Sequence, residues 1–102
     1  MEERWQKMSI FEQMGNIYSE LSRAESWEKR NDIEAKINSL DRALELINFT
    51  LSDKRFKNRL KEVARLKELV ADHYLGGRVY GIPLAEINSC LLPFAIKARE
   101  LN

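Results

Sequence analysis

The chain has 102 residues and a formal net charge of +1, from 17 Lys and Arg against 16 Asp and Glu with the single His neutral. Hydrophobic residues make up 44% of the chain and charged residues 32%, with four Gly, two Pro and one Cys. This composition is typical of one globular, helix-rich domain over residues 1–102, and it excludes collagenous, disordered and disulfide-rich chains.

No stretch of the sequence predicts a membrane segment or a secretory signal. The longest apolar stretch near the C-terminus, residues 91–96, contains a proline and falls far short of the roughly 20 residues that cross a bilayer. The first nine residues are polar and lack the apolar core of a signal peptide. We therefore expect a cytoplasmic protein with no membrane partner, in which Cys90 is an inert core thiol.

The first helix is expected over residues 10–28. Ser9 and Glu12 match a capping box at its start. Trp5 precedes this cap, and we expect it to pack as a lid over one end of the fold. One buried stripe is predicted by apolar residues at helical spacing: Ile10, Met14, Ile17, Leu21 and Ala24.

The second helix is expected over residues 33–51, where the apolar periodicity is strongest. Its main stripe follows spacings of four and three: Ile33, Ile37, Leu40, Leu44, Ile47 and Leu51. A second apolar group lies on nearly the opposite side at about 100° per residue: Ala35, Leu46 and Phe49. A helix that is apolar on two sides is either central in the fold or shared with a partner.

Two further helices complete the expected fold. Residues 54–75 predict a third helix that ends at Gly76 and Gly77, with a buried face formed by Phe56, Leu60, Val63, Val70 and Tyr74 and with Leu66 at its edge. A fourth helix starts near Pro83, and Pro93 predicts a kink or short break before a terminal helical piece over residues 94–101. Four helices with short connections predict an all-α fold, an antiparallel up-down four-helix bundle.

The residues available for catalysis are few. The one His and the one Cys, His73 and Cys90, lie on different expected helices, and the sequence has no helix-borne metal motif. The glycine-rich segment 76–81 lacks the Lys-Ser/Thr pair of a phosphate-binding loop, so we interpret it as a turn. We therefore favour a non-enzymatic protein and assign no catalytic residue, no metal and no cofactor. An enzyme acting on a small molecule is the third hypothesis, and it would need Glu20, Arg23 and His73 to converge in a pocket.

Charge is distributed unevenly along the chain. Residues 1–53 carry −4 and residues 54–102 carry +5. At about 100° per residue, a basic stripe forms on the third helix from Lys54, Lys57, Lys61 and Arg65. Three readings stay open for this stripe: a solvated face, a contact with the acidic half of a neighbouring protomer, or a site for RNA.

A second candidate surface is a polar stripe on the first helix. Its members share one face at spacings of three and four: Gln13, Asn16, Glu20, Arg23 and Trp27. These side chains could converge on a ligand or dock a partner helix, although Glu20 and Arg23 could equally form an ordinary surface ion pair. An indole at the end of a polar stripe favours a contact.

Several short segments resemble a group of small, uncharacterised prokaryotic all-helical proteins. The resemblance rests on Trp5-x-x-Met8-Ser9, Glu12-Gln13-Met14-Gly15-Asn16-Ile17, Arg42-Ala43-Leu44-Glu45-Leu46, Arg59-Leu60-Lys61-Glu62 and Leu92-Pro93-Phe94-Ala95. It implies an all-helical fold and brings no catalytic residue. More distantly, the chain is similar to the HEPN-like helical bundles, whose RNA-cutting members pair an Arg with a His. Seven residues separate Arg65 from His73 here, one more than that motif allows.

The leading functional hypothesis is a self-associating protein-interaction module, a homo-oligomer with a dimer favoured, which could also take another protein as partner. Its contact surface would be the second side of the second helix (Ala35, Leu46 and Phe49) or the polar stripe of the first. The alternative is RNA binding through the basic stripe, with a HEPN-like nuclease as its sharpest form.

Overall fold

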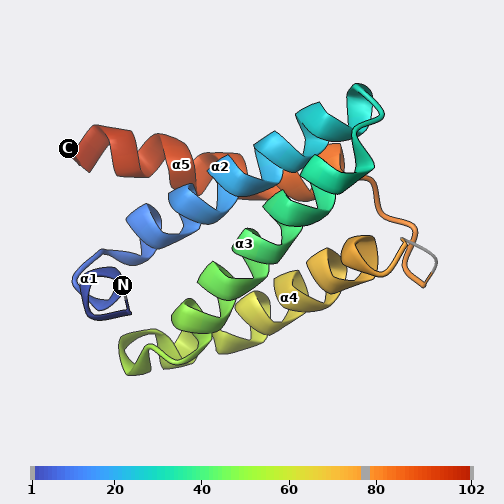
Figure 1. The fold of residues 1–102 in the computed structure, drawn as a ribbon. Coiled ribbons are helices and arrows are strands. Elements are labelled where there is room, and N and C mark those ends of the chain that lie inside the picture. The colour runs from blue at the N-terminus through green and yellow to red at the C-terminus, as the bar shows by residue number, and fades with distance from the viewer. Residues whose placement is uncertain (1, 77–78, 102) are drawn as a thin grey trace.

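The computed structural model describes residues 2–76 and 79–101, and it is all-α over these residues (Figure 1). Its elements are α1 (Glu2–Gln6), α2 (Ile10–Lys29), α3 (Ile33–Leu51), the 3₁₀ helix η1 (Lys54–Arg59), α4 (Leu60–Tyr74) and α5 (Leu84–Leu101). The predictions of an all-α fold and of four main helices are confirmed. The short helix α1 was not predicted.

Helix α2 occupies the centre of the fold, because it packs extensively against both α3 and α5. Helix α4 packs mainly against α3 and has few contacts with α5. In Figure 1 the chain reverses direction between α2 and α3 and again between α3 and α4, while α5 lies against α2 and apart from α4. The helices therefore form a row, α5-α2-α3-α4, whose two ends approach each other without close packing.

The apolar stripe predicted for the first helix is the core of the fold. All five of its residues are buried, and the capping box at Ser9 and Glu12 is present. The other helices complete the same cluster with Leu40, Ala43, Ile47, Val63, Leu66, Val70, Leu84, Ile87 and Leu91. Small residues bring α5 close to α2, because a Cβ atom on Gly15 would lie 3.6 Å from the Cα of Ala95 and 3.7 Å from the Cβ of Ala98.

The prediction of one continuous third helix is wrong. Residues Lys54–Arg59 form a 3₁₀ helix, and Phe56 has the non-helical angles φ −110° and ψ 32°. Asp53 accounts for this geometry, since its carboxylate accepts hydrogen bonds from the backbone N–H of Arg55 and from the side chain of the same residue. The α-helix begins at Leu60, six residues after the expected start at Lys54.

Three predictions of burial are also wrong. Tyr74 and Ile33 are exposed, each at the end of a helix where the neighbouring helix no longer covers it. Cys90 is exposed rather than a core thiol, because α4 does not close over that side of α5. Helix α5 continues through Pro93 without a separate terminal piece, and a kink there stays a prediction.

The connection from α4 to α5 is fastened by side chains at the end of α4. Asp72 is buried and accepts hydrogen bonds from the backbone N–H groups of Val79 (3.0 Å) and Tyr80 (3.2 Å), which lower its pKa. The predicted helix stop is confirmed at Gly76, which has a φ of +116°. The other glycine of that prediction, Gly77, lies outside the described residues.

Truncation in the core should separate packing from surface position on the same helix. Ile47→Ala removes a side chain that is 0% exposed and should lower the free energy of unfolding by about 2–5 kcal/mol through lost burial and a residual cavity. Ile33→Ala, at a position that is 60% exposed, should change it by less than about 0.5 kcal/mol. Urea denaturation measures both, and equal effects would contradict the assignment of the core.

Candidate interaction surfaces

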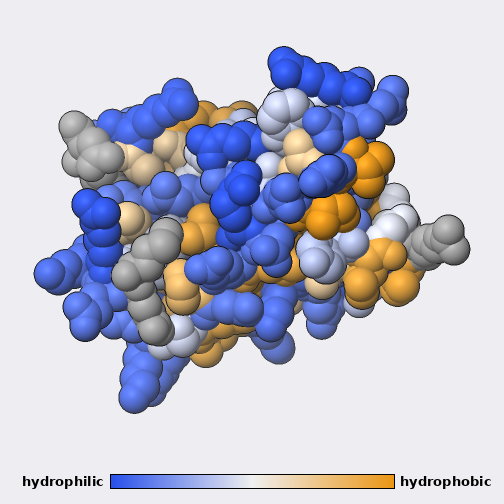
Figure 2. Space-filling view, in the orientation of Figure 1, coloured by the Kyte–Doolittle hydropathy of each residue, from blue (hydrophilic) through white to orange (hydrophobic). Residues whose placement is uncertain are grey.

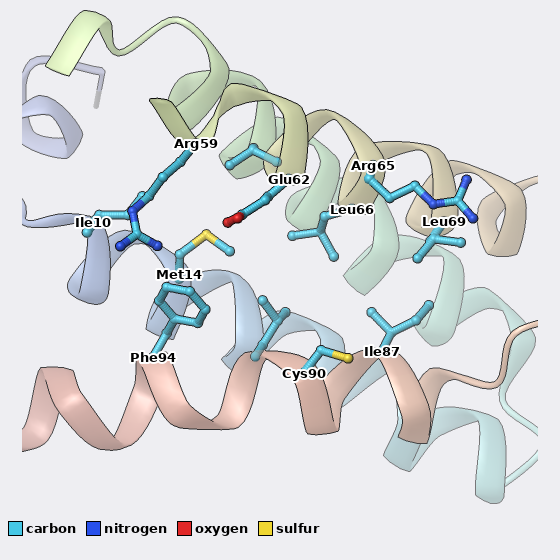
Figure 3. A pocket seen from close by; sticks show the side chains of 12 residues that line it. Ile10, Met14, Arg59, Glu62, Arg65, Leu66, Leu69, Ile87, Cys90 and Phe94 are labelled. Atoms are coloured by element: carbon cyan, nitrogen blue, oxygen red, sulfur yellow. The ribbon is translucent and has the colours of Figure 1, made fainter. Parts of the chain in front are cut away.

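An apolar groove lies between α4 and α5, with α2 as its floor (Figure 3). Its volume is about 270 Å³. It is lined by Ile10, Met14, Arg59, Glu62, Val63, Arg65, Leu66, Leu69, Ile87, Cys90, Leu91 and Phe94. Nine of these twelve residues are apolar or Cys, so the sparse packing between α4 and α5 leaves hydrophobic surface that no other described element covers.

The three charged residues of the groove all come from α4 and the residue before it. Figure 3 shows Arg59 at the same end as Ile10, Met14 and Phe94, whereas Arg65 lies at the other end and points away. The guanidinium of Arg59 lies 5.8 Å from the centre of the Phe94 ring. The Arg65 guanidinium lies 3.2 Å from a carboxylate oxygen of Glu68 and 4.7 Å from the centre of the Tyr80 ring. These two contacts already engage its charge.

A second apolar surface runs along the outward side of α5, and we call it the outer stripe. It consists of Ala85, Ser89, Leu92, Ile96 and Arg99, all exposed and spaced by four and three residues. Leu92 is 42% exposed and Ile96 48% exposed. Sequence reasoning missed this stripe because α5 also carries a buried apolar face, so its periodicity does not single out one side.

Other exposed hydrophobic side chains gather after the end of α4, where Leu75, Val79 and Tyr80 line one hollow. On the face drawn in Figure 2, hydrophilic side chains cover most of the surface and hydrophobic ones show in separate small patches. Scattered exposed apolar residues are normal on a folded protein. The groove and the outer stripe are the two hydrophobic surfaces to which α5 contributes.

The polar stripe predicted on the first helix is only partly a surface, because Gln13 is fully buried. Its amide nitrogen donates to the backbone carbonyl of Trp5 (3.0 Å) and to Asp53 (3.1 Å), and its amide oxygen accepts from Thr50 (2.9 Å). The indole N–H of Trp5 donates to the same Thr50 hydroxyl at 3.1 Å. Gln13 thus connects α1, α2 and α3. The prediction that it lies on a partner-binding surface is wrong, because its side chain is buried.

The rest of that stripe is accessible in varying degree. Asn16 is exposed, and Glu20 pairs with both Arg23 and Arg42. Trp27 is half-buried, and the Arg30 guanidinium lies 5.4 Å from its ring centre. The structure therefore brings the charged members together as an ion-pair cluster, which is an ordinary surface arrangement.

The second apolar side predicted on the second helix is largely covered. Ala35, Leu46 and Phe49 are half-buried, and the latter two pack against the core cluster. The ring of Trp5 lies 6.5 Å from that of Phe49, so α1 shields part of this face. It offers less free apolar surface than the outer stripe of α5.

The basic stripe is split between two elements. Lys54 and Lys57 lie on η1, whereas Lys61 and Arg65 lie on α4, so they do not follow one helical line. All four are exposed. The three lysines form no ion pair within the described part of the chain, whereas Arg65 pairs with Glu68.

Arg65 and His73, the residues compared with the HEPN pair, have different partners. Arg65 contacts Glu68 and Tyr80, whereas the ring nitrogen Nε2 of His73 contacts the carbonyl oxygen of Ile82. These contacts therefore do not bring the two side chains together at one site.

A polar pair between α2 and α5 was also missed. Asn88 is buried and donates to Glu25 (2.8 Å) and to the carbonyl of Leu21 (3.3 Å). The hydrogen bond from Asn88, followed by that from Lys29, lowers the pKa of Glu25. The only sign of this pair in the sequence was an Asn on the buried face of an apolar helix. That sign does not indicate that Glu25 is its hydrogen-bond partner.

Neither a metal site nor a membrane span appears in residues 2–76 and 79–101. No group of three or more His, Cys, Asp or Glu side chains there is arranged to hold a metal ion. None of the helices in these ranges combines the length and hydropathy needed to cross a bilayer.

Comparison with known proteins gives no relative: no family model, curated protein sequence or solved structure matches this chain. The resemblances described from the sequence therefore stay predictions.

The buried network at Gln13 should make stability depend on pH through Asp53. The Arg55 guanidinium, helped by the Gln13 amide and opposed by burial, lowers the pKa of Asp53 from 3.8 to about 2. A carboxyl group with a lowered folded-state pKa stabilises the fold above its unfolded pKa, and this contribution is lost as the pH falls from about 4 to about 2. Asp53→Asn should therefore cost about 2 kcal/mol at pH 7 and progressively less towards pH 2.

Urea denaturation of both proteins between pH 7 and pH 2 measures this difference. Asp41→Asn, an exposed position on α3, is the matched control and should cost less than about 0.5 kcal/mol at pH 7. A cost for Asp53→Asn that does not shrink with falling pH would contradict the role of the carboxylate.

Proposed function

We propose that this chain is a non-enzymatic, self-associating protein-interaction module that forms a dimer through the outer stripe of α5. The observation that carries the proposal is the exposure of Leu92 and Ile96 on α5, a helix that packs mainly against α2 and has few contacts with α4. The proposal includes the finer fold, an antiparallel up-down bundle left open between α4 and α5, with a kink at Pro93. It also places the protein in the cytoplasm, where an exposed free thiol such as that of Cys90 stays reduced.

The outer stripe is complementary to itself. Helix α5 spans Leu84–Leu101, so its midpoint falls between Leu92 and Pro93. Ser89 and Ile96 lie equally far from this midpoint. An antiparallel contact about a twofold axis would place the small Ser89 of each copy opposite the large Ile96 of the other, with the two Leu92 side chains at the centre. Small residues facing large ones allow two helices to pack closely.

The size of this stripe predicts a weak dimer. Complete burial of a Leu or Ile side chain contributes about 1.5–3 kcal/mol, and these two side chains are already about half buried. Four such side chains in a dimer therefore give roughly 4 kcal/mol, which corresponds to a dissociation constant near 1 mM before the neighbouring residues add their share. Because ordering two molecules also costs free energy, we expect dimers only at high protein concentration.

A charge placed in the outer stripe should abolish the dimer. At high protein concentration, sedimentation equilibrium should show masses rising towards twice the 12.0 kDa of one chain. Leu92→Lys should hold the mass at that of one chain, because association would bury an unpaired ammonium group. Leu75→Lys is the matched control, at an 80% exposed position after α4, and should leave the association unchanged. A monomeric wild-type protein, or equal effects of the two variants, would contradict the proposal.

Cross-linking tests the antiparallel register directly. In a Cys90→Ser background, Leu92→Cys places one thiol from each copy near the twofold axis, where a disulfide can form under mild oxidation. Leu75→Cys in the same background should cross-link much more slowly. Equal rates of cross-linking for the two variants would exclude this register.

RNA binding through Lys54, Lys57 and Lys61 is the second candidate function. It is supported by the exposure of these lysines and by their lack of ion pairs within the described residues. The nuclease form of this reading lacks such support, because Arg65 and His73 contact different groups.

Binding to a mixed RNA and DNA pool at several salt concentrations tests the RNA candidate. Three lysine contacts predict a slope of log affinity against log salt near −2.7 on duplex DNA, from about −0.9 per contact. The slope should fall on replacing Lys57 and Lys61 with Gln. Absence of binding at low salt would eliminate this candidate and leave the lysines as a solvated face.

A further inference from the structure

We propose that the groove between α4 and α5 is a binding site for a small amphiphilic carboxylate. Its apolar tail would lie along the groove, and its carboxylate would lie at the end marked by Arg59 and Lys97. This site is separate from the outer stripe, because Cys90 and Phe94 line the groove whereas Leu92 and Ile96 lie on roughly the opposite side of α5 at about 100° per residue.

The size of the groove suits a small apolar molecule. A volume of about 270 Å³ is close to the lower end of the range for small-molecule sites, about 300–1,000 Å³. It is nearly twice the roughly 150 Å³ of an apolar cavity that admits benzene. A whole helix, about 10 Å across with its side chains, would not enter such a space. An aliphatic chain would fill it and would displace water from its apolar walls.

The charges at one end indicate an anionic head group. Arg59 forms no ion pair within the described part of the chain, and its guanidinium lies over the Phe94 ring. Among residues 2–76 and 79–101, the one ion-pair partner of Lys97 is Glu100, at a long distance of 3.8 Å. Both cations line a hollow beside the groove, together with Phe11, Pro93 and Phe94. Arg59 and Phe94 also line the groove itself. Two cations beside aromatic rings are a suitable binding site for a carboxylate at the mouth of an apolar channel.

The other charged groups set the direction of the ligand. At the opposite end, Arg65 is held by Glu68 and Tyr80. Figure 3 shows the carboxylate of Glu62 directed into the space between the two ends. Its negative charge would repel a carboxylate placed in the middle of the groove, so the head group is favoured only beside Arg59 and Lys97. Glu62 is exposed and can turn to solvent when an apolar tail occupies the groove.

Titration calorimetry of the full chain with octanoate, octylamine and octanol, each below its micelle-forming concentration, tests the site. Octanoate should bind at one site per chain and more tightly than the other two probes. Arg59→Gln and Lys97→Gln together should weaken octanoate by about tenfold, through loss of two charge-assisted contacts, and should leave octanol unchanged. Glu62→Gln should strengthen octanoate, because it removes the repelling charge.

A pair of neighbouring variants locates the site. Cys90→Trp fills the groove from an exposed position on α5 and should abolish binding, whereas Ser89→Trp, one residue away and outside the groove, should not affect it. Circular dichroism shows whether each variant keeps its helices. Absence of octanoate binding, equal binding of all three probes, or equal effects of the two Trp variants would each overturn the proposal. Because Leu92→Lys should leave octanoate binding intact, failure of the dimer would not be mistaken for failure of this site.

Discussion

The rest of the structure depends on the burial of one face of α2 against two helices at once. The stripe Ile17, Leu21 and Ala24 is fully buried between α3 and α5. An apolar stripe on a helix is only about 100° wide. Contact with α3 and α5 therefore leaves little of the stripe of α2 for α4 to cover. Helix α4 then reaches the core through α3, where Val63 and Val70 are buried. The fold is consequently a row of helices with an open seam between its first and last members.

The open seam leaves two sides of α5 uncovered. This helix has one buried face on α2, one side on the groove and one side in solvent, yet it has the highest apolar content of the long helices. The buried network around Gln13, Thr50 and Asp53 fixes the far end of the fold, where α1 and η1 meet α2 and α3. The two uncovered sides of α5 lie on other parts of the fold, and these are the surfaces at which we propose that a second molecule binds.

The sequence predicted the helices better than it predicted the surfaces. The ends of the first two helices and the stripe of α2 followed from capping residues and from spacing, because both are local properties. Gln13 looked like a surface residue because its position on the helix gives no information about Asp53, 40 residues later. Cys90 looked like a core residue because its apolar neighbours do not show whether α4 covers them. Residues Lys54–Arg59 form a 3₁₀ helix because Arg55 donates a backbone hydrogen bond to Asp53. The spacing of apolar residues along the sequence gives no information about this bond.

The most direct test of this account is the reactivity of Cys90, the single cysteine, towards a soluble aromatic disulfide reagent. An open seam leaves this thiol exposed, so its rate in native buffer should lie within about tenfold of its rate in denaturant. If α4 closed over α5, the thiol would react only on global unfolding. With a stability of at least about 5 kcal/mol, that reaction would be slowed by about a thousandfold or more. Such protection would contradict the open seam and both surfaces inferred for α5.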